Sequence, residues 1–526
     1  MYAGTYAVER AEQACFIMAE SGEIVTYGDY ERRTNRLARL LRANGFDRLD
    51  HYSIFMENNS RYIECCGAGD RSGLYYTCVN SHLTASELAY IVNNSESKGL
   101  IVSSATRDVA LEALPMCPAL TLLLIVHADA DARAGAGGDA DDGPFVDFVE
   151  SVSAYPDTPI DDEWAGAAML YSSGTTGQPK GIIRELPMMS PGEQLPLFQF
   201  LTKMWQYREG MIYLSPAPLY HSAPQAAVGL TIRSGGTAIV MEHFDPEAYL
   251  ALVERHGVTH TQLVPTMFSR MLKLPDDVRL RYDTSSLEIA VHAAAPCPVP
   301  VKQAMIEWWG PIIFEYYGAT EAIGFTACDS TEWLTHPGTV GQVKLGELHI
   351  LDDDMTECPN GTPGTIWFKT PNPLRYFHDE VKSRESSSPD GSMATVGDVG
   401  YVDDEGYLYL TDRKTFMIIS GGVNIYPQEC ENLLITHPKV ADAAVFGVPN
   451  ADLGEEVKAV VQVMPGNEAG PELAKELIAF CQQNLARQKC PRSVDFEDQL
   501  PRLPTGKLYK RQLRDRYWPA GVTRIV

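Results

Sequence analysis

The sequence predicts an α/β protein with at least two domains, and three observations lead to this prediction. Its 526 residues exceed what one hydrophobic core usually supports. Hydrophobic residues make up 45% and charged residues 21% of the chain, which is the composition of an ordinary globular protein. From Thr26 onward, apolar strand-like segments alternate with amphipathic helical ones. This alternation is typical of βα units and a largely parallel sheet.

The first part of the chain gives these elements in order. Apolar and aromatic residues at helical spacing predict a helix over residues 27–41. Thr84 and Glu87 form a capping box, T-x-x-E, which opens a second helix with the sequence ELAYIVNNS. The predicted strands are residues 51–56, 74–80, 99–104, 121–127 and 167–171.

A domain boundary is expected late in the chain. A run of strand-like segments ends at residues 406–414, and a shorter α/β pattern follows. That pattern has a helix at 428–436, the strand-like VADAAVFGV and EVKAVVQVM, and a helix at 472–485. We therefore predict an N-terminal domain over residues 1–412, a C-terminal domain over 413–526, and a hinge at about 412–415.

Charge and composition exclude several kinds of partner and location. The chain has 43 Lys and Arg against 69 Asp and Glu, a net charge of −26, so a basic nucleic-acid-binding face is not expected. No apolar stretch approaches the roughly 20 residues that a membrane helix needs, and no export signal is visible. The 11 cysteines are scattered without a C-x-x-C pattern, which favours reduced thiols in a cytoplasmic protein.

The segment YSSGTTGQPKGI, residues 171–182, is the strongest local signal. It is not a P-loop, because Gly174 and Gly177 are only three apart, Pro179 precedes Lys180, and Gly181 replaces the metal-binding hydroxyl. A buried strand nevertheless leads into a loop rich in hydroxyls and glycine, which can form an anion-binding concavity. A simple polar turn is the alternative.

The whole string resembles the phosphate loop of the adenylate-forming superfamily, which includes acyl-CoA synthetases, adenylation domains of nonribosomal peptide synthetases, and beetle luciferases. Four further segments match that family in order and spacing: PLYHSAP (218–224), YYGATEAIG (316–324), VGDVGYVDDEGYLYLTDR (396–413) and LPTGKLYKRQLR (503–514). The resemblance spans about residues 26–514. It implies a large N-terminal domain with βαβ-type mixed sheets sandwiching helices plus a β-barrel-like subdomain, and a small, mobile α+β C-terminal domain.

The resemblance also implies an ATP-dependent carboxylate–CoA ligase. The acid would attack the α-phosphate of ATP, giving acyl-AMP and pyrophosphate, and CoA would then form acyl-CoA and release AMP. The implied cofactors are ATP, Mg²⁺ and coenzyme A. Positive charge and metal are needed because the first step brings an anion toward a polyanion.

Four residues would act on the reacting groups. Lys507, in PTGK, would reach the carboxylate and the α-phosphate, and Thr320 would bond the α-phosphate. Glu321 would hold Mg²⁺ as a hard oxygen ligand. His221 would form an aromatic gate beside the acyl carboxylate.

The nucleotide would be held by the loop and by later segments. Tyr317 would stack on adenine, Asp398 would accept hydrogen bonds from both ribose hydroxyls, and Arg413 would add a donor near ribose and phosphate. A satisfied core histidine explains the neighbouring His292 at least as well as a functional role. The full implied set is Ser172, Ser173, Gly174, Thr175, Thr176, Gly177, Lys180, Ala294, Ala295, Pro296, Tyr316, Tyr317, Gly318, Ala319, Asp398 and Arg413.

CoA would approach through the C-terminal domain. Gly421 and Gly422, in IISGGVNIYPQE, would present bare backbone to the pantetheine arm. Lys507 and Gly422 belong to the same small domain, yet each must visit one active site, so the resemblance implies domain rotation about the hinge. Thr415 stands where the family commonly has Asp or Lys at this hinge.

The sequence constrains the acid only by class. No carboxylate follows Tyr220 and His221 to pair with a substrate ammonium, so amino-acid activation is not expected. Small residues at 223, 226, 227, 229 and 293–295 would line a wide, apolar channel for a fatty, aryl-propenoic or steroid side-chain acid, although alanines on a helix also simply permit close packing. The sequence leaves the oligomeric state open, and a homodimer is one arrangement that it allows.

Two rival functions are weighed against CoA ligation. One is an adenylate-forming enzyme that loads a carrier-protein thiol or oxidises the acyl-adenylate. The other is a nucleotide-binding regulator without turnover. The presence of Lys507, Glu321 and the glycine hairpin argues against the regulator.

Overall fold

Two compact units make up the chain. The computed structural model describes residues 2–127, 142–172, 179–370, 374–413, 416–421, 423–450, 452–501 and 508–518. The first unit comprises Met1–Gln262, Ser286–Glu288 and Arg375–Lys382. The second comprises Leu263–Ser285, Ile289–Leu374 and Ser383–Val526.

A seven-stranded sheet forms one side of the first unit. Its central strands are buried on both faces, which is why they read as continuous apolar runs in the sequence. The strands are parallel except for the last, which runs antiparallel to its neighbour. In order across the sheet they are β7 (Val146–Asp147), β6 (Leu122–Val126), β5 (Ser97–Ser103), β3 (His51–Phe55), β4 (Tyr75–Cys78), β8 (Ala167–Ser172) and β9 (Lys180–Ile182).

The first unit also contains a second group of paired strands. These are parallel except for the antiparallel hairpin partner at one edge. In spatial order they are β12 (His260–Leu263), β10 (Ile212–Ser215), β11 (Thr237–Val240), β1 (Ala14–Met18) and β2 (Ile24–Thr26).

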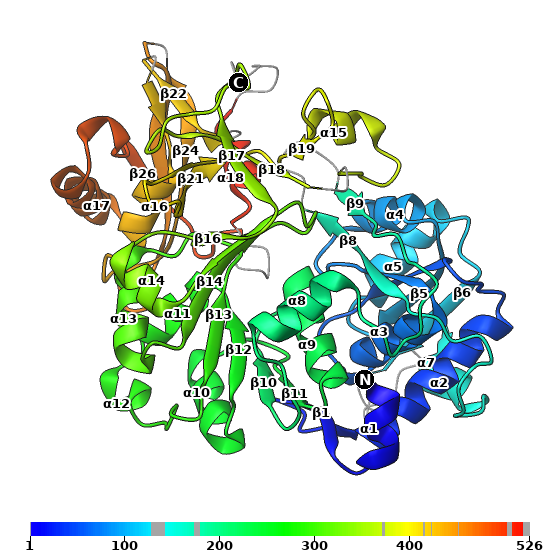
Figure 1. Cartoon of the computed structure of the whole chain (residues 1–526). Helices are drawn as coiled ribbons and strands as arrows, with labels where there is room; N and C mark the ends of the chain where they lie inside the picture. The colour runs from blue at the N-terminus through cyan, green and yellow to red at the C-terminus, as the bar shows by residue number, and fades with distance from the viewer. Residues whose placement is uncertain are drawn as a thin grey trace. The chain divides into compact units, whose positions relative to one another are not determined.

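Helices cover these sheets and fill the space between them. Helices α4 and α5 pack on one face of β5 and β6, as Figure 1 shows. Side chains from α2, α3 and α9 join strands of both sheets in one buried core. The helices of this unit are α1 (Ala3–Glu9), α2 (Tyr27–Ala43), α3 (Ser60–Ser72), α4 (Ala85–Asn94), α5 (Arg107–Ala113), η1 (Leu114–Met116), α7 (Phe148–Ser153), α8 (Pro196–Met204), α9 (Ser222–Arg233) and α10 (Pro246–His256).

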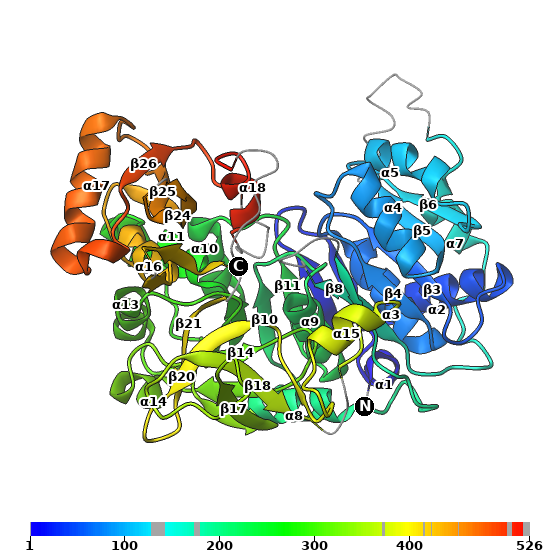
Figure 2. The ribbon, with the colours of Figure 1, turned by 90° about the horizontal axis from the view of Figure 1, so that it is seen from above.

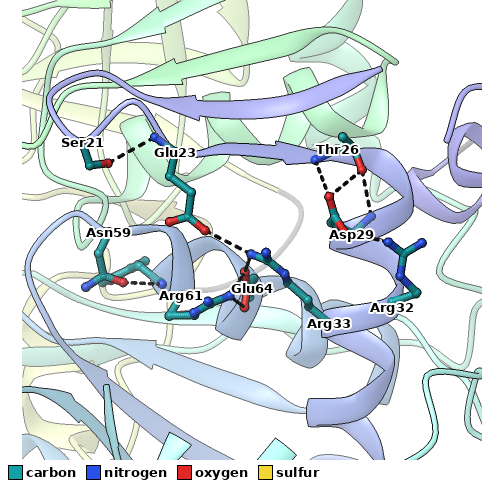
Figure 3. A network of polar contacts seen from close by, with 10 residues as sticks. Ser21, Glu23, Thr26, Asp29, Arg32, Arg33, Asn59, Arg61 and Glu64 are labelled. Carbon is teal, nitrogen blue, oxygen red and sulfur yellow. Dashed lines mark hydrogen bonds and ion pairs between the residues drawn. The ribbon is translucent and has the colours of Figure 1, made fainter. Parts of the chain in front are cut away.

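A buried carboxylate ties α2 to α3, as Figure 3 shows. The Glu64 side chain is only 2% exposed and accepts hydrogen bonds from Arg33 Nη1 at 2.8 Å and Arg61 Nη1 at 2.7 Å. Burial raises the pKa of Glu64, and the two guanidinium groups oppose that shift. Arg33 also pairs with Glu23 at 3.2 Å, which connects this network to the β1–β2 hairpin.

The second unit begins with strands that carry predicted site residues. β13 (Ile289–His292) and β14 (Ile313–Gly318) are parallel, whereas β15 (Phe325–Cys328) and β16 (Gln342–Leu345) continue the sheet in antiparallel pairs. A separate antiparallel sheet contains β17 (Glu347–Leu351), β18 (Gly364–Lys369), β19 (Met393–Ala394), β20 (Asp398–Val402) and β21 (Leu408–Arg413). The accompanying helices are α11 (Pro265–Leu272), α12 (Asp276–Arg279), α13 (Val299–Trp309), α14 (Ser330–Thr335) and α15 (Glu380–Glu385).

The last part of the chain has its own sheet and core. Figure 2 shows α16 and α17 beside its strands, and Ile418, Leu434, Val445 and Leu477 belong to the core beneath them. The elements are β22 (Ile418–Ser420), β23 (Val423–Ile425), α16 (Gln428–Ile435), β24 (Val440–Asn450), β25 (Gly454–Val463), α17 (Pro471–Asn484), η3 (Arg487–Lys489), β26 (Ser493–Phe496) and α18 (Lys510–Arg514).

These elements confirm the predicted α/β class, with several mixed sheets and helices between them. The capping box is present, since Thr84 N donates to Glu87 Oε2 at 2.9 Å at the start of α4. Among the described helices, none is both long enough and apolar enough to cross a bilayer.

Candidate active site

The predicted phosphate loop connects two paired strands of the first unit. Ser172, at the end of β8, lies opposite Lys180, at the start of β9. The Lys180 ammonium lies 4.7 Å from the centre of the Tyr376 ring, and Tyr171 OH donates to Asn94 Oδ1 at 2.7 Å. The strand pairing therefore holds both ends of the loop together. The predicted ligands Ser173, Gly174, Thr175, Thr176 and Gly177 lie outside the described residues.

Residues predicted for the adenosine come together in the second unit. Tyr317, in β14, donates its hydroxyl proton to Asp398 Oδ2 at 2.9 Å, and Asp398 is the first residue of β20. The Asp398 backbone is in register with that of Arg413 in β21, whose side chain is outside the described part. Two motifs that are 81 residues apart thus meet at one hydrogen bond.

Aromatic packing fixes the Tyr316–Tyr317 pair. The Tyr316 ring stacks on Phe325 with centroids 4.9 Å apart, and the Tyr317 ring lies 6.4 Å from Phe368. A Cβ at Gly324 would lie only 2.0 Å from Phe368 Cδ1, so a glycine is required there. The last glycine of YYGATEAIG therefore makes room for the ring that supports Tyr317.

Thr320 and Glu321 follow β14 in a turn that Ala322 N closes by donating to Ala319 O at 2.9 Å. Both side chains are half-buried. The backbone of Ala322 is left-handed, with φ of +54°, and so is that of Ala294, with φ of +74°. Such conformations cost about 1–3 kcal/mol for non-glycine residues and concentrate at functional sites. Both lie in segments that the sequence assigns to the nucleotide.

A buried charged network lies beneath these segments. Lys302 Nζ, on α13, donates to Glu315 Oε2 at 2.6 Å, and His292 Nε2 lies 3.4 Å from the same oxygen. The exposures of the three side chains are 0% for Lys302 and His292 and 5% for Glu315. His292 and Glu315 are direct partners in the β13–β14 pairing. The network therefore ties α13 to β14, which contains Tyr316, beside the end of β13, which leads to Ala294.

The protonation states of this network follow from burial. Burial lowers the pKa of His292, and the Lys302 cation lowers it further, so the imidazole is neutral. Burial raises the pKa of Glu315, and Lys302 opposes this shift by its charge and its hydrogen bond. Neither ring nitrogen of His292 has a hydrogen-bond partner among the described residues. His292 is thus a core residue, as the sequence suggested, but not a satisfied one.

Lys302 and Glu315 were missed by the sequence reasoning. A lysine in an amphipathic helix and a glutamate in a strand are ordinary residues when they are read one at a time. The signal available was Glu315 inside the apolar run PIIFEYY, because a buried carboxylate needs a cationic partner. The sequence could not identify Lys302 as that partner.

His221 lies in the first unit, at the N-terminus of α9. Its ring centre is 4.4 Å from that of Tyr220, and Gln225 N donates to His221 O at 3.1 Å. Ala223 and Ala226 lie on the same helix and are half-buried, whereas Ala227 is buried. The helix thus begins with the predicted gate and continues with small side chains.

The last part of the chain carries the residues predicted for CoA. Gly421, between β22 and β23, has φ of +57°, and its N–H donates to Leu453 O at 2.8 Å. A buried ion pair joins Lys510 Nζ in α18 to Glu431 Oε1 in α16 at 2.9 Å. Residues 422 and 507 lie outside the described part.

No group of three or more His, Cys, Asp or Glu side chains arranged to hold a metal occurs in the part of the chain that the structure describes. A Mg²⁺ ion that reaches a protein with a nucleotide needs only one or two carboxylates, since phosphates and water supply its other ligands. A single half-buried Glu321 fits that requirement.

Replacing Lys302 by Met should lower the free energy of unfolding by about 3–5 kcal/mol, because the Glu315 carboxylate would be left buried without its cation. The double variant Lys302→Met, Glu315→Met should regain most of this loss in denaturant unfolding. Lys475→Met, at a side chain that is 73% exposed, is the matched control and should change stability by less than about 0.5 kcal/mol. If the loss of unfolding free energy in the double variant equals the sum of the losses in the two single variants, Lys302 and Glu315 do not interact.

Two family models match the chain. The model of the AMP-binding enzyme matches residues 5–377, and that of the AMP-binding enzyme C-terminal domain matches residues 429–507. The first match contains the phosphate loop, Tyr317 and Glu321, and the second ends at Lys507.

Individual proteins and a solved structure that are similar over nearly the whole chain point to the same family. A feruloyl-CoA synthase of Amycolatopsis sp is 32% identical over 522 residues, covering 98% of this chain and 99% of its own. A fatty acid–[acyl-carrier-protein] ligase, ScoC, of Streptomyces coeruleorubidus is 29% identical over 510 residues, covering 96% and 94%. The crystal structure of ATP-bound MatB from Rhodopseudomonas palustris superposes with a TM-score of 0.77 at 27% identity, covering 98% of this chain and 99% of MatB. The chain therefore belongs to the AMP-binding enzyme family, whose members form acyl-adenylates.

Proposed function

We propose that this chain is an AMP-forming acyl-CoA synthetase that joins a carboxylic acid with a hydrophobic body to CoA. The acid carboxylate attacks the α-phosphorus of ATP, pyrophosphate leaves, and the CoA thiol then displaces AMP from the acyl carbon. The observation that carries this proposal is the 2.9 Å hydrogen bond between Tyr317 and Asp398. It joins the two side chains proposed for adenine and ribose.

The adenosine is proposed to bind in the second unit. Tyr317 offers a ring face, and Asp398 has a second carboxylate oxygen that can accept from ribose hydroxyls. Phe368 supports the Tyr317 ring, and the buried Lys302–Glu315 pair secures β14 behind it. Ala294, Ala295 and Pro296 then flank the adenine, with the positive φ of Ala294 turning the backbone there.

The phosphates are proposed to meet the loop between β8 and β9. Ser172 and Lys180 hold its ends opposite each other, and its intervening backbone N–H groups and hydroxyls suit an oxyanion. Thr320 binds the α-phosphate, and Arg413 adds a donor near ribose. When Mg²⁺ is bound, it neutralises phosphate charge, and Glu321 is the residue proposed to hold it.

Domain alternation is proposed for the CoA step, with an N-terminal domain at 1–412 and a C-terminal domain at 413–526. Lys510 lies three residues after Lys507, and its buried pairing with Glu431 fixes the start of α18. Gln428 N donates to Asp412 Oδ2 at 3.0 Å, next to the proposed hinge at Thr415. Rotation would withdraw Lys507 and deliver Gly421 and Gly422 to the pantetheine arm.

The cellular location is proposed from the thiols. All eleven cysteines are unpaired, which is the state expected in a reducing compartment. This supports a cytoplasmic enzyme.

A second candidate is transfer of the acyl group to a carrier-protein thiol. One observation favours it, namely the similarity to a fatty acid–[acyl-carrier-protein] ligase at 29% identity. The two candidates share the adenylation step and differ only in the thiol that completes the reaction.

AMP release should rise at least tenfold when free CoA is added to enzyme, ATP and acid, because the thiol discharges a bound intermediate. The measurement is a coupled assay of AMP with CoA, with a phosphopantetheinylated carrier protein, or with neither. AMP release that responds to the carrier protein and not to CoA would establish the second candidate instead.

Two substitutions should separate the half-reactions. Lys507→Ala should slow acyl-AMP formation by about 10²–10³-fold, the usual effect of losing one stabilising group, and spare thioester formation from supplied acyl-AMP. Gly422→Leu should do the reverse, because a side chain would obstruct the pantetheine arm. Each variant is the other's control in single-turnover assays of both steps. Equal losses in both steps for either variant would contradict the alternation.

A further inference from the structure

The short segment Arg375–Lys382 packs on the edge of the seven-stranded sheet. It belongs to the first unit, although the chain immediately before and after it belongs to the second. Tyr376 pairs with Ile182 of β9 in an antiparallel bridge, and Phe377 N donates to Gly181 O at 2.8 Å. The segment therefore continues this sheet beyond β9.

Stacked rings and a turn hold the segment in place. The Phe377 ring stacks on His51 with ring centres 5.9 Å apart, and His51 stacks on Tyr75 at 4.8 Å. Burial lowers the pKa of His51 to about 4, so this ring is neutral at pH 7 and lies in the stack without a charge. His378 has a left-handed backbone, with φ of +55°, and its Nε2 lies 3.0 Å from Glu96 Oε1. A non-glycine residue keeps this conformation only where the surrounding contacts maintain it.

The segment places the Tyr376 ring against the Lys180 ammonium. Lys180 Nζ lies 4.7 Å from the ring centre, within the distance of about 6 Å at which a cation is attracted to the negative face of an aromatic ring. Tyr376 is only 5% exposed, so packing fixes its ring. Lys180 faces Ser172 across the two ends of the predicted phosphate loop. The ring therefore contacts the ammonium at the base of that loop.

Contact with a ring suits a lysine that binds phosphate. A lysine carries its charge on a flexible four-carbon stem, and fixing that stem costs conformational entropy. A ring that holds the ammonium before the ligand arrives lowers the entropy cost of binding. Unlike a carboxylate, the ring leaves the positive charge of the lysine intact. Because Thr320 is the residue proposed for the α-phosphate, the loop and Lys180 are left with the β- and γ-phosphates.

We propose that Tyr376 is a positioning residue, whose ring face holds the Lys180 ammonium in place for the β- and γ-phosphates of ATP. The proposal rests on the proposed function and deepens it, because it adds to the triphosphate site a residue from a segment far from the phosphate loop in sequence. Tyr376 itself touches neither the acid nor the α-phosphate and acts only through Lys180.

The first test is calorimetric titration of the full chain with ATP and Mg²⁺, and separately with AMP. Tyr376→Leu should weaken ATP binding by about 3- to 30-fold, the range for a cation–π contact, and leave the Kd for AMP unchanged, because AMP lacks the two phosphates concerned. Tyr376→Phe keeps the ring face and should retain the Kd for ATP within about twofold. The control Glu96→Gln removes an ion pair of the same segment, with side chains 62% and 52% exposed, and should also retain it.

A double-mutant cycle tests whether Tyr376 acts through Lys180. Lys180→Met should itself weaken ATP binding. In that background Tyr376→Leu should have no further effect on the Kd for ATP, because the ring then has no cation to hold. A role of Tyr376 in the fold alone would give the same loss with or without the lysine.

Ring fluorination tests the same contact without a change of side-chain shape. Phenylalanines with increasing numbers of ring fluorines, incorporated at position 376, carry a progressively weaker negative charge on the ring face. The Kd for ATP should rise with each added fluorine, and the Kd for AMP should stay constant. If Tyr376→Leu does not fold, this series still decides the question.

Three results would overturn the proposal. They are tighter ATP binding in Tyr376→Leu, which would mean that the ring withholds the lysine, equal losses in the presence and absence of Lys180, and a Kd for ATP that does not depend on fluorination. Failure of the proposed function would look different. In that case no acid would support exchange of pyrophosphate with ATP, whereas ATP binding would still respond to the ring at position 376.

Discussion

The buried ion pair between Lys302 and Glu315 is the interaction on which the proposed adenosine site depends. It joins α13 to β14 next to His292, the last residue of β13, and these two strands lead into the segments proposed to bind the adenosine. A buried ion pair adds little net stability compared with a well-packed hydrophobic pair. Removing either partner is costly, however, because the other charge is then left unpaired in a low-dielectric interior. The pair thus holds α13 against β14, the strand that also carries Tyr317.

The same electrostatic rule applies in two other places. Glu64 is held by Arg33 and Arg61 at the α2–α3 contact, and Glu431 is held by Lys510 in the last part of the chain. These buried acids have cations from the protein.

Much of the fold could be predicted from the sequence, because burial on both faces leaves a continuous apolar run. The strands expected at 51–56 and 121–127 occur at His51–Phe55 and Leu122–Val126, and the helix expected at 472–485 occurs at Pro471–Asn484. Helix caps could also be predicted where they depend on residues close in sequence, as with the Thr84–Glu87 capping box.

The arrangement of the candidate site could be predicted only in part. The motifs named Tyr317 and Asp398, but only the fold puts them 2.9 Å apart, and no pattern identifies Lys302 as the partner of Glu315. The left-handed backbone of Ala294 is also invisible in sequence. The roles of Thr175, Thr176, Gly422 and Lys507 remain predictions.

The central claim is that this site makes an acyl-adenylate from ATP and a free acid. The most direct measurement is isotope exchange between labelled pyrophosphate and ATP in the absence of CoA, because reversal of adenylation is the step that returns label to ATP. The account predicts exchange that requires both the acid and Mg²⁺ and does not require CoA. Thioester formation that releases ADP and phosphate, with no exchange of pyrophosphate, would contradict it.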